Sequence, residues 1–257
     1  MSERIFEAFE RARADGRRAA LMPYMMAGYP SVEASREVAR QYVSGGADLI
    51  ELGVPFSDPL ADGPVIHAAA TEALANGTRL ADALAVAAEV ASEVPVILMC
   101  YVNPILARGY QRFADQLVGA GVAGVIIPDL PQEEAAEALA AFESRGLALV
   151  PLLAPTTPDA RMAEIGARAR GFVYTVSVAG TTGERGELDL APVISRARKA
   201  TRVPVAIGFG ISTPEHTAAA ADAGADGVIV GTRFVRAVGE DPAGVGKLVR
   251  AFGDALG

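Results

Sequence analysis

Short apolar runs alternate along the chain with longer segments in which apolar and polar residues recur at helical spacing. Each run is rich in Val, Ile, Leu and Ala and has almost no polar interruption. Runs of this kind are typical of strands that are buried on both faces of a parallel sheet. The pattern predicts eight strands, at Ala19–Met26, Leu49–Leu52, Val96–Tyr101, Gly124–Ile127, Ala148–Leu153, Phe172–Val176, Val205–Gly208 and Gly227–Val230.

The segments between these runs have the periodicity of amphipathic helices. One start signal is Thr213, a capping residue that directly precedes Pro214. Several segments end in glycine just before the next strand, and glycine permits the left-handed turn that closes a helix. The predicted helices include Ser31–Ser44, Arg79–Ser92, Glu133–Arg145, Pro158–Arg168 and Pro214–Ala223, and a further helix over Glu3–Ala14 precedes the first strand.

Eight strands, each followed by a helix, within 257 residues indicate an α/β fold of the (β/α)8 TIM-barrel type. The alternative is an open doubly wound sheet. It is less favoured because no Gly-x-Gly-x-x-Gly motif follows the first strand. No linker or low-complexity tract interrupts the alternation, so we expect one barrel domain over residues 1–257. The extra N-terminal helix, Glu3–Ala14, would cover the barrel floor.

Composition excludes several classes of function. The formal net charge of -8 argues against nucleic acid or an anionic membrane as the main partner. Cys100 is the only cysteine, and two histidines are too few for a three-histidine zinc site, so we expect no metal site. The longest mostly apolar stretch, 94–107, is too short to span a bilayer, and the first residues lack a signal-peptide core. These features predict a soluble cytoplasmic protein.

Chemistry in this fold lies in the loops that follow the strands. Two of these loops are long, Gly53–Pro64 and Ser177–Asp189, and the second is rich in Gly and Thr, as a mobile lid would be. Glu51 lies at the end of the second strand, where burial would raise the pKa of its carboxyl and allow proton exchange near neutral pH. The alternative for Glu51 is a structural ion pair.

Two aspartates are weaker candidates when each is taken alone. Asp62 closes the first long loop, but it could simply cap the helix that starts near Pro64. Asp129 follows the fourth strand and could be either a site residue or a loop anchor. The histidines, His67 and His216, fall in the first turns of predicted helices, where we expect them at the surface or behind the site.

A phosphate site is predicted where the last two strands end. Gly208-Phe209-Gly210 follows the seventh strand, and Gly231-Thr232 follows the eighth and opens a short helix. Barrel enzymes often bind phosphate between these two loops, through backbone N–H groups and a helix N-terminus. Gly183 in the second long loop could add a further donor. The alternative is that each glycine merely ends a strand.

The run from Leu49 to Pro64, LIELGVPFSDPLADGP, closely resembles the signature of the tryptophan synthase alpha chain family. Four further motifs match that family in order along essentially the whole chain: Tyr101-Val102-Asn103-Pro104, Pro128-Asp129-Leu130-Pro131, Gly180-Thr181-Thr182-Gly183 and Gly208-Phe209-Gly210-Ile211-Ser212. The family is a (β/α)8 barrel that cleaves indole-3-glycerol phosphate to indole and glyceraldehyde 3-phosphate. The resemblance therefore implies a lyase of tryptophan biosynthesis.

The resemblance also implies roles for individual residues. Glu51 and Asp62 would be catalytic, and Tyr24 stands where the family commonly has Phe, which leaves a hydroxyl without a named partner. Thr232 stands where the family usually has Ser. The substrate would contact Tyr24, Ile66, Met99, Tyr101, Ile126, Leu153, Tyr174, Thr182, Phe209 and Ile229, and phosphate would lie on Gly183, Gly210, Gly231 and Thr232.

The residues available restrict the chemistry of such a retro-aldol cleavage. Lys199 and Lys247 are the only lysines, and both fall on predicted outer helices, away from any Schiff-base position. Carboxylate acid–base catalysis remains, with the indole ring itself as the electron sink. Family members pair with a pyridoxal-phosphate beta chain in an α2β2 complex, and the loops 55–58 and 103–109 would face that partner. This chain should bind no cofactor.

Two other functions stay open at this stage. One is a different phosphate-binding barrel enzyme, such as a sugar-phosphate isomerase, although no catalytic Lys or His is placed at a strand end. The other is a weakly catalytic or non-catalytic binding subunit that mainly activates a beta partner. In that case the Glu51–Asp62 loop would be an interface feature.

Overall fold

The protein is described by a computed structural model over residues 2–176, 190–208 and 210–257. Its strands form one parallel sheet in the order β5-β4-β3-β2-β1-β9-β8-β7-β6. The first strand, β1, pairs with both β2 and the last strand, β9, which an open doubly wound sheet does not allow. The strands are β1 (Ala20–Met26), β2 (Ile50–Gly53), β3 (Val96–Met99), β4 (Gly124–Ile126), β5 (Ala148–Leu149), β6 (Leu152–Leu153), β7 (Val173–Val176), β8 (Val205–Gly208) and β9 (Gly227–Val230).

The fifth predicted strand, Ala148–Leu153, is split into β5 and β6, and it closes the barrel. Only Val150 and Pro151 separate the two pieces. The backbone N–H of Val150 donates to Val125 on one side (2.9 Å), and Pro151 accepts from the N–H of Tyr174 on the other side (3.0 Å). Proline has no N–H to donate, so a regular ladder cannot continue through it. The remaining predicted strands are confirmed within two residues at either end.

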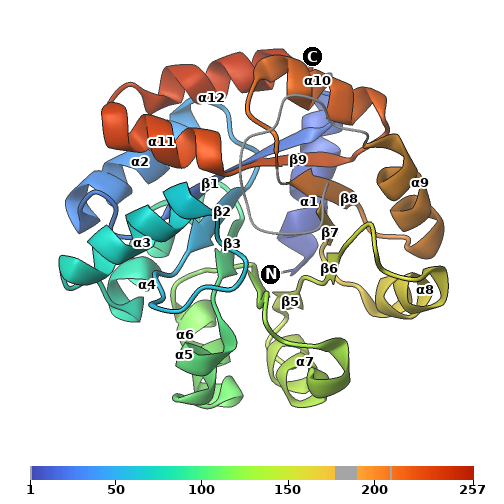
Figure 1. Cartoon of the computed structure of the whole chain (residues 1–257), viewed down its shortest axis with the longest axis horizontal. Helices are drawn as coiled ribbons and strands as arrows, with labels where there is room; N and C mark the ends of the chain where they lie inside the picture. The colour runs from blue at the N-terminus through green and yellow to red at the C-terminus, as the bar shows by residue number, and fades with distance from the viewer. Residues whose placement is uncertain (1, 177–189, 209) are drawn as a thin grey trace.

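The helices lie outside the ring of strands, except for α1, which crosses the ring (Figure 1). The predicted helix Glu133–Arg145 is a 3-10 turn, η1 (Gln132–Glu134), followed by a separate α7. The helices are α1 (Ser2–Ala14), α2 (Val32–Ser44), α3 (Pro64–Ala75), α4 (Leu80–Val90), α5 (Val102–Leu106), α6 (Tyr110–Gly119), α7 (Ala136–Glu143), α8 (Asp159–Arg168), α9 (Ala191–Ala200), α10 (Pro214–Asp222), α11 (Thr232–Glu240) and α12 (Val245–Asp254).

Helix α1 covers the barrel floor, as the sequence predicts. Its apolar face, which includes Ile5 and Phe9, belongs to the same buried cluster as the inward-facing side chains Met22 and Phe172. The rings of Phe9 and Phe172 lie 5.9 Å apart between centroids. The amino-terminal end of the barrel is therefore packed with side chains, which leaves the opposite end for a ligand.

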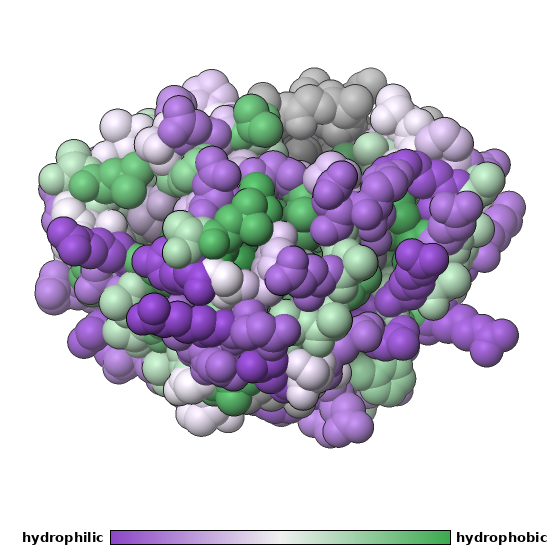
Figure 2. All heavy atoms as spheres, turned by 90° about the horizontal axis from the view of Figure 1, so that it is seen from below, coloured by the Kyte–Doolittle hydropathy of each residue, from purple (hydrophilic) through white to green (hydrophobic). Residues whose placement is uncertain are grey.

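The helix start signal at Thr213 is confirmed, because Thr213 caps α10 by accepting a hydrogen bond from the N–H of His216 (3.3 Å). Ser31, which was predicted as the first residue of its helix, is the cap of α2 and accepts from the N–H of Ala34 (3.1 Å). The outer face seen in Figure 2 is mostly hydrophilic, with smaller apolar areas between the polar side chains. Among the helices in the described ranges, none combines the length and the apolar character that crossing a membrane requires.

Candidate active site

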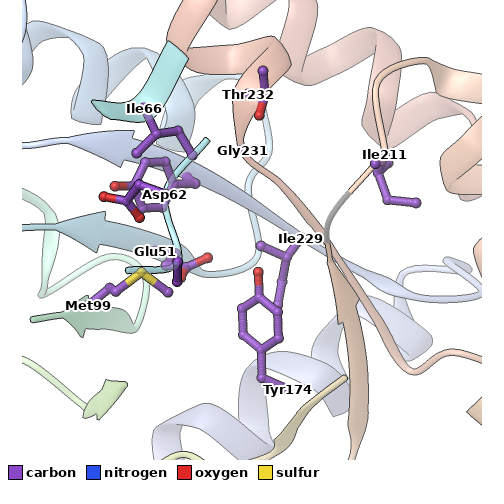
Figure 3. Close-up of a pocket in the computed structure, with 12 residues that line it drawn as sticks. Glu51, Asp62, Ile66, Met99, Tyr174, Ile211, Ile229, Gly231 and Thr232 are labelled. Carbon is purple, nitrogen blue, oxygen red and sulfur yellow. The ribbon is translucent and has the colours of Figure 1, made fainter. Parts of the chain in front are cut away.

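A cavity lies at the carboxyl ends of the strands. Its volume is about 470 Å³, including the space that opens to solvent at its mouth. Figure 3 shows Glu51, Asp62 and Met99 on one wall and the Tyr174 ring rising from the other. Ten residues that the sequence singles out line this cavity: Tyr24, Glu51, Asp62, Ile66, Met99, Tyr174, Gly210, Ile229, Gly231 and Thr232.

Glu51 is a buried carboxyl that has no hydrogen-bond partner among the described residues. It lies in the middle of β2, opposite Tyr24 of β1 and Ile97 of β3, and its side chain is 1% exposed. Neither of its carboxyl oxygens has a hydrogen-bond partner in the described part of the chain, so no described cation neutralises it. Burial, and secondly the nearby charge of Asp62, raise the pKa of Glu51 to about 8. Glu51 can therefore give and take a proton near neutral pH.

Asp62 reaches the same cavity from the loop between β2 and α3. It does not cap α3, because the N-terminal cap of that helix is Gly63 and no side chain bonds there. Burial raises the pKa of Asp62, while the Tyr101 hydroxyl and the charge of His67 act in the opposite direction. Asp62 thus has neighbours that favour its ionised form, whereas no described residue favours the ionised form of Glu51. As the pH falls, Glu51 is accordingly protonated before Asp62.

Tyr101 holds the loop that carries Asp62. Its hydroxyl accepts a hydrogen bond from the backbone N–H of Ala61 (3.1 Å). Its ring stacks on Phe56 with 5.1 Å between centroids. The sequence places Tyr101 among the substrate contacts, but the structure places it behind Asp62 and not on the cavity wall. Its contacts anchor the loop at both ends.

Asp129 makes a hydrogen bond that anchors a neighbouring loop. Its carboxylate accepts a hydrogen bond from the N–H of Val102 (2.8 Å), at the start of α5. Of the two interpretations left open by the sequence, the loop anchor therefore accounts for this residue.

The other end of the cavity is built from backbone. Gly210 has φ +76°, a left-handed conformation that favours glycine. Gly231 is the N-terminal cap of α11 and makes no side-chain capping bond, so the first N–H groups of that helix lie at the cavity. A methyl group at Gly231 would meet only an ordinary contact with Ile66 (3.5 Å), so space alone does not require glycine there. Helix N-termini of this kind favour anions.

Two apolar residues that were predicted in the pocket are not among those that line the cavity. Ile126 lies inside the barrel, in the same buried cluster as the lining residues Tyr174 and Ile229. Leu153 was predicted on the wrong face, because it packs outside the barrel with residues such as Met162 of α8 and Val173 of β7. Leu152 instead packs against the interior cluster. Pro151 breaks the strand just before these two leucines, so alternation within the apolar run did not reveal which one faces inward.

Some predicted site residues cannot be placed, and two lining residues were missed. Thr182, Gly183, Phe209 and the whole Ser177–Asp189 loop lie outside the described residues. Ala61 and Ile211 line the cavity without having been predicted. Both lie inside motifs that the sequence analysis quotes, next to Asp62 and Gly210, so closeness to those motifs was the signal that could have found them.

The lysines lie where the sequence predicts. Lys199 is on α9 and Lys247 on α12, and both are exposed on the outside of the barrel. Neither can form a Schiff base with a ligand in the cavity. Within the described ranges, no three His, Cys, Asp or Glu side chains come together as a metal site would need.

Comparison with known proteins agrees with this geometry. The family model described as tryptophan synthase alpha chain matches residues 9–252. The tryptophan synthase alpha chain of Synechococcus elongatus is 46% identical over 257 residues, covering 98% of this chain and 96% of that one. That of Prochlorococcus marinus is 48% identical over 236 residues, covering 90% and 86%. A structure of tryptophan synthase from Mycobacterium tuberculosis has a TM-score of 0.93 at 37% identity, covering 98% of this chain and 97% of that one. On this evidence of sequence and fold, the chain belongs to the tryptophan synthase alpha chain family.

Proposed function

We propose that the cavity is the active site for the family's reaction, the cleavage of indole-3-glycerol phosphate to indole and glyceraldehyde 3-phosphate. The observation that carries this proposal is the buried Glu51 carboxyl, which has no hydrogen-bond partner in the described chain and whose pKa burial raises to about 8. The phosphate would bind at Gly210, Gly231 and Thr232, and the indole ring between Ile66, Met99 and Ile229. The two acids and these proposed contacts all line one cavity, which supports a single site for both halves of the substrate.

Glu51 would move one proton in each turnover. Its carboxylic acid protonates C3 of the indole ring, which makes the ring an electron acceptor. The resulting carboxylate then takes the proton of the adjacent glycerol hydroxyl. As that proton leaves, the hydroxyl carbon becomes an aldehyde, the C–C bond to C3 breaks, and its electron pair returns to the ring. The proton balance is zero over the cycle, and neither a lysine nor a metal is needed.

Asp62 would stabilise the charge that forms on the ring. After protonation at C3, the indole nitrogen carries positive charge, and an ionised Asp62 that accepts its N–H hydrogen bond stabilises this state. The different surroundings of the two carboxyls support this division of roles. General acid–base catalysis of this kind contributes roughly 10²–10⁴-fold in rate.

We further propose that the chain works with a beta chain, as an α2β2 complex in the cytoplasm, and that residues 1–257 form one domain. The loop 55–58 and the segment 103–109 would face the partner. Two of the large apolar side chains that the structure leaves exposed lie in or next to them, Leu60 (77% exposed) and Leu106 (53% exposed). A beta chain that binds these two segments would cover both exposed side chains.

The direct test is release of indole from indole-3-glycerol phosphate by the purified chain, first alone and then with a tryptophan synthase beta chain. Activity of the chain alone, increased by the partner, supports an enzyme that is activated in the complex. A chain that stimulates the beta reaction but never releases indole would be a binding subunit, which is the alternative function. Binding of sugar phosphates without cleavage of the indole substrate would point to a different barrel enzyme.

A further inference from the structure

The hydroxyl of Tyr24 lies over a strand position that has no side chain. Tyr24 is on β1, directly opposite Glu51 of β2, and is 4% exposed. Gly53, two residues beyond Glu51 and on the same face, leaves the space that the phenol fills. A methyl group at Gly53 would come within 2.1 Å of the Tyr24 hydroxyl oxygen. The position of this hydroxyl is therefore fixed by the backbone of β2.

The backbone of Tyr24 is also held from behind. The buried hydroxyl of Tyr42, on α2, donates a hydrogen bond to the Tyr24 carbonyl (3.0 Å). Tyr24 is therefore fixed at its backbone and at its hydroxyl, and its ring lines the cavity together with both acids. A Phe would fill the ring position equally well, so packing alone does not explain the hydroxyl.

The hydroxyl is a hydrogen-bond donor on a residue that lines the same cavity as two carboxyls. Burial, then the charges of Asp62 and Glu51 in that order, raise the pKa of Tyr24 well above its ordinary value, so the phenol keeps its proton. Neither oxygen of Glu51 has a hydrogen-bond partner among the described residues, which include Tyr24, so the phenol does not donate to Glu51. Asp62 is the carboxylate that remains for it.

We propose that Tyr24 is a positioning residue whose hydroxyl donates a hydrogen bond to the Asp62 carboxylate in the substrate-loaded site. This inference rests on the proposed function and adds a role that lining the indole pocket does not include. The bond would hold Asp62 ionised and oriented toward the indole nitrogen, with Tyr101 supporting the loop from the other side. Glu51 would stay free of the phenol and available to carry the proton.

The test is Tyr24→Phe in the chain assembled with its beta partner, assayed for indole release across pH. A hydrogen bond to a charged group is worth on the order of tenfold in an equilibrium or rate. We expect kcat to fall about tenfold and KM to change less than about threefold. Because Asp62 must be ionised, the acidic limb of the kcat profile should move upward by about one pH unit. A loss confined to KM, or an unchanged pH profile, overturns the proposal.

Two further variants separate the possible explanations. Tyr110→Phe removes the hydroxyl of another buried tyrosine, on α6, and should leave kcat and the pH profile unchanged; the same shift in this control would also overturn the proposal. In an Asp62→Asn background, Tyr24→Phe should have no further effect on the residual rate, because the acceptor is already gone. An additive effect there contradicts a role through Asp62. If Asp62→Asn itself turns over normally, the role of Asp62 fails and this inference fails with it. The proposed function fails only if the wild-type chain releases no indole, so the two failures are distinguishable.

Discussion

The charge of Asp62 raises the pKa of Glu51, although Glu51 lies within a strand and Asp62 in the loop that follows it. Glu51 is fixed within β2, and Asp62 lies just before α3. Burial contributes more than Asp62 to the raised pKa of Glu51, and both effects favour its protonated form. Both effects keep Glu51 protonated at neutral pH, and they make the free energy of unfolding depend on pH.

The stability of the fold should decrease as the pH rises through the pKa of Glu51. The pKa is about 8 in the folded chain and close to 4.5 when the residue is exposed, so the folded state holds a proton that the unfolded state releases. The stabilising contribution is fully present below about pH 4.5 and is lost toward pH 8 and above, at up to about 1.4 kcal/mol per pH unit.

Urea unfolding of wild type and Glu51→Gln, measured from pH 5 to 9, checks this expectation. The glutamine carries no titrating proton, so the wild type should lose stability relative to the variant as the pH rises. Parallel stability curves for the two proteins across this range would show that the pKa of Glu51 is not raised in the folded chain.

Removing the Thr232 hydroxyl should weaken phosphate binding and leave the chemical step intact. Thr232 begins α11 and lines the cavity next to Gly231. Thr232→Val keeps the shape of the side chain, so we expect KM to rise about threefold to tenfold, which corresponds to one lost hydrogen bond, with little change in kcat. Steady-state kinetics, together with titration of glycerol phosphate, would measure both effects.

Thr71→Val is a suitable control for this substitution, since Thr71 lies on the exposed face of α3 and its hydroxyl bonds only within the helix. An equal rise in KM for the control, or a fall in kcat alone for Thr232→Val, would argue against a phosphate contact.

Truncation of Leu153 should affect the fold and not the substrate. Leu153 packs outside the barrel against α8 and β7. Leu153→Ala should therefore cost about 2–5 kcal/mol in the free energy of unfolding and leave KM unchanged. Chemical denaturation and kinetics on the same preparation would separate the two effects. A raised KM with little loss of stability would contradict this prediction and would indicate that Leu153 lines the indole pocket.

Most of the fold could be predicted from the sequence because each strand is a distinct apolar run with a helix after it. The strand that closes the barrel was predicted less accurately. In the run Ala148–Leu153, Pro151 lacks the N–H that a continuous ladder needs, so the strand divides and the alternation of faces is lost. The misplacement of Leu153 has this cause.

The sequence predicted which residues form the site better than it predicted what each of them contacts. The motif around Glu51 and Asp62 led to both acids, and the loops after the last strands led to Gly210, Gly231 and Thr232. The sequence could not distinguish a helix cap from a cavity residue at Asp62, because that depends on where α3 begins. Nor could it provide a partner for the Tyr24 hydroxyl, because the space for it comes from Gly53 on the neighbouring strand.

The most direct test of the account is single-turnover cleavage of indole-3-glycerol phosphate by Glu51→Gln, with substrate binding measured on the same protein. Glutamine keeps the size of the side chain but cannot transfer the proton, so the account predicts folded protein, near-normal binding and a rate lower by about 10²–10⁴-fold. Glu89→Gln, at a surface ion pair with Arg40, is the matched control and should react normally. Near-wild-type cleavage by Glu51→Gln would contradict the account.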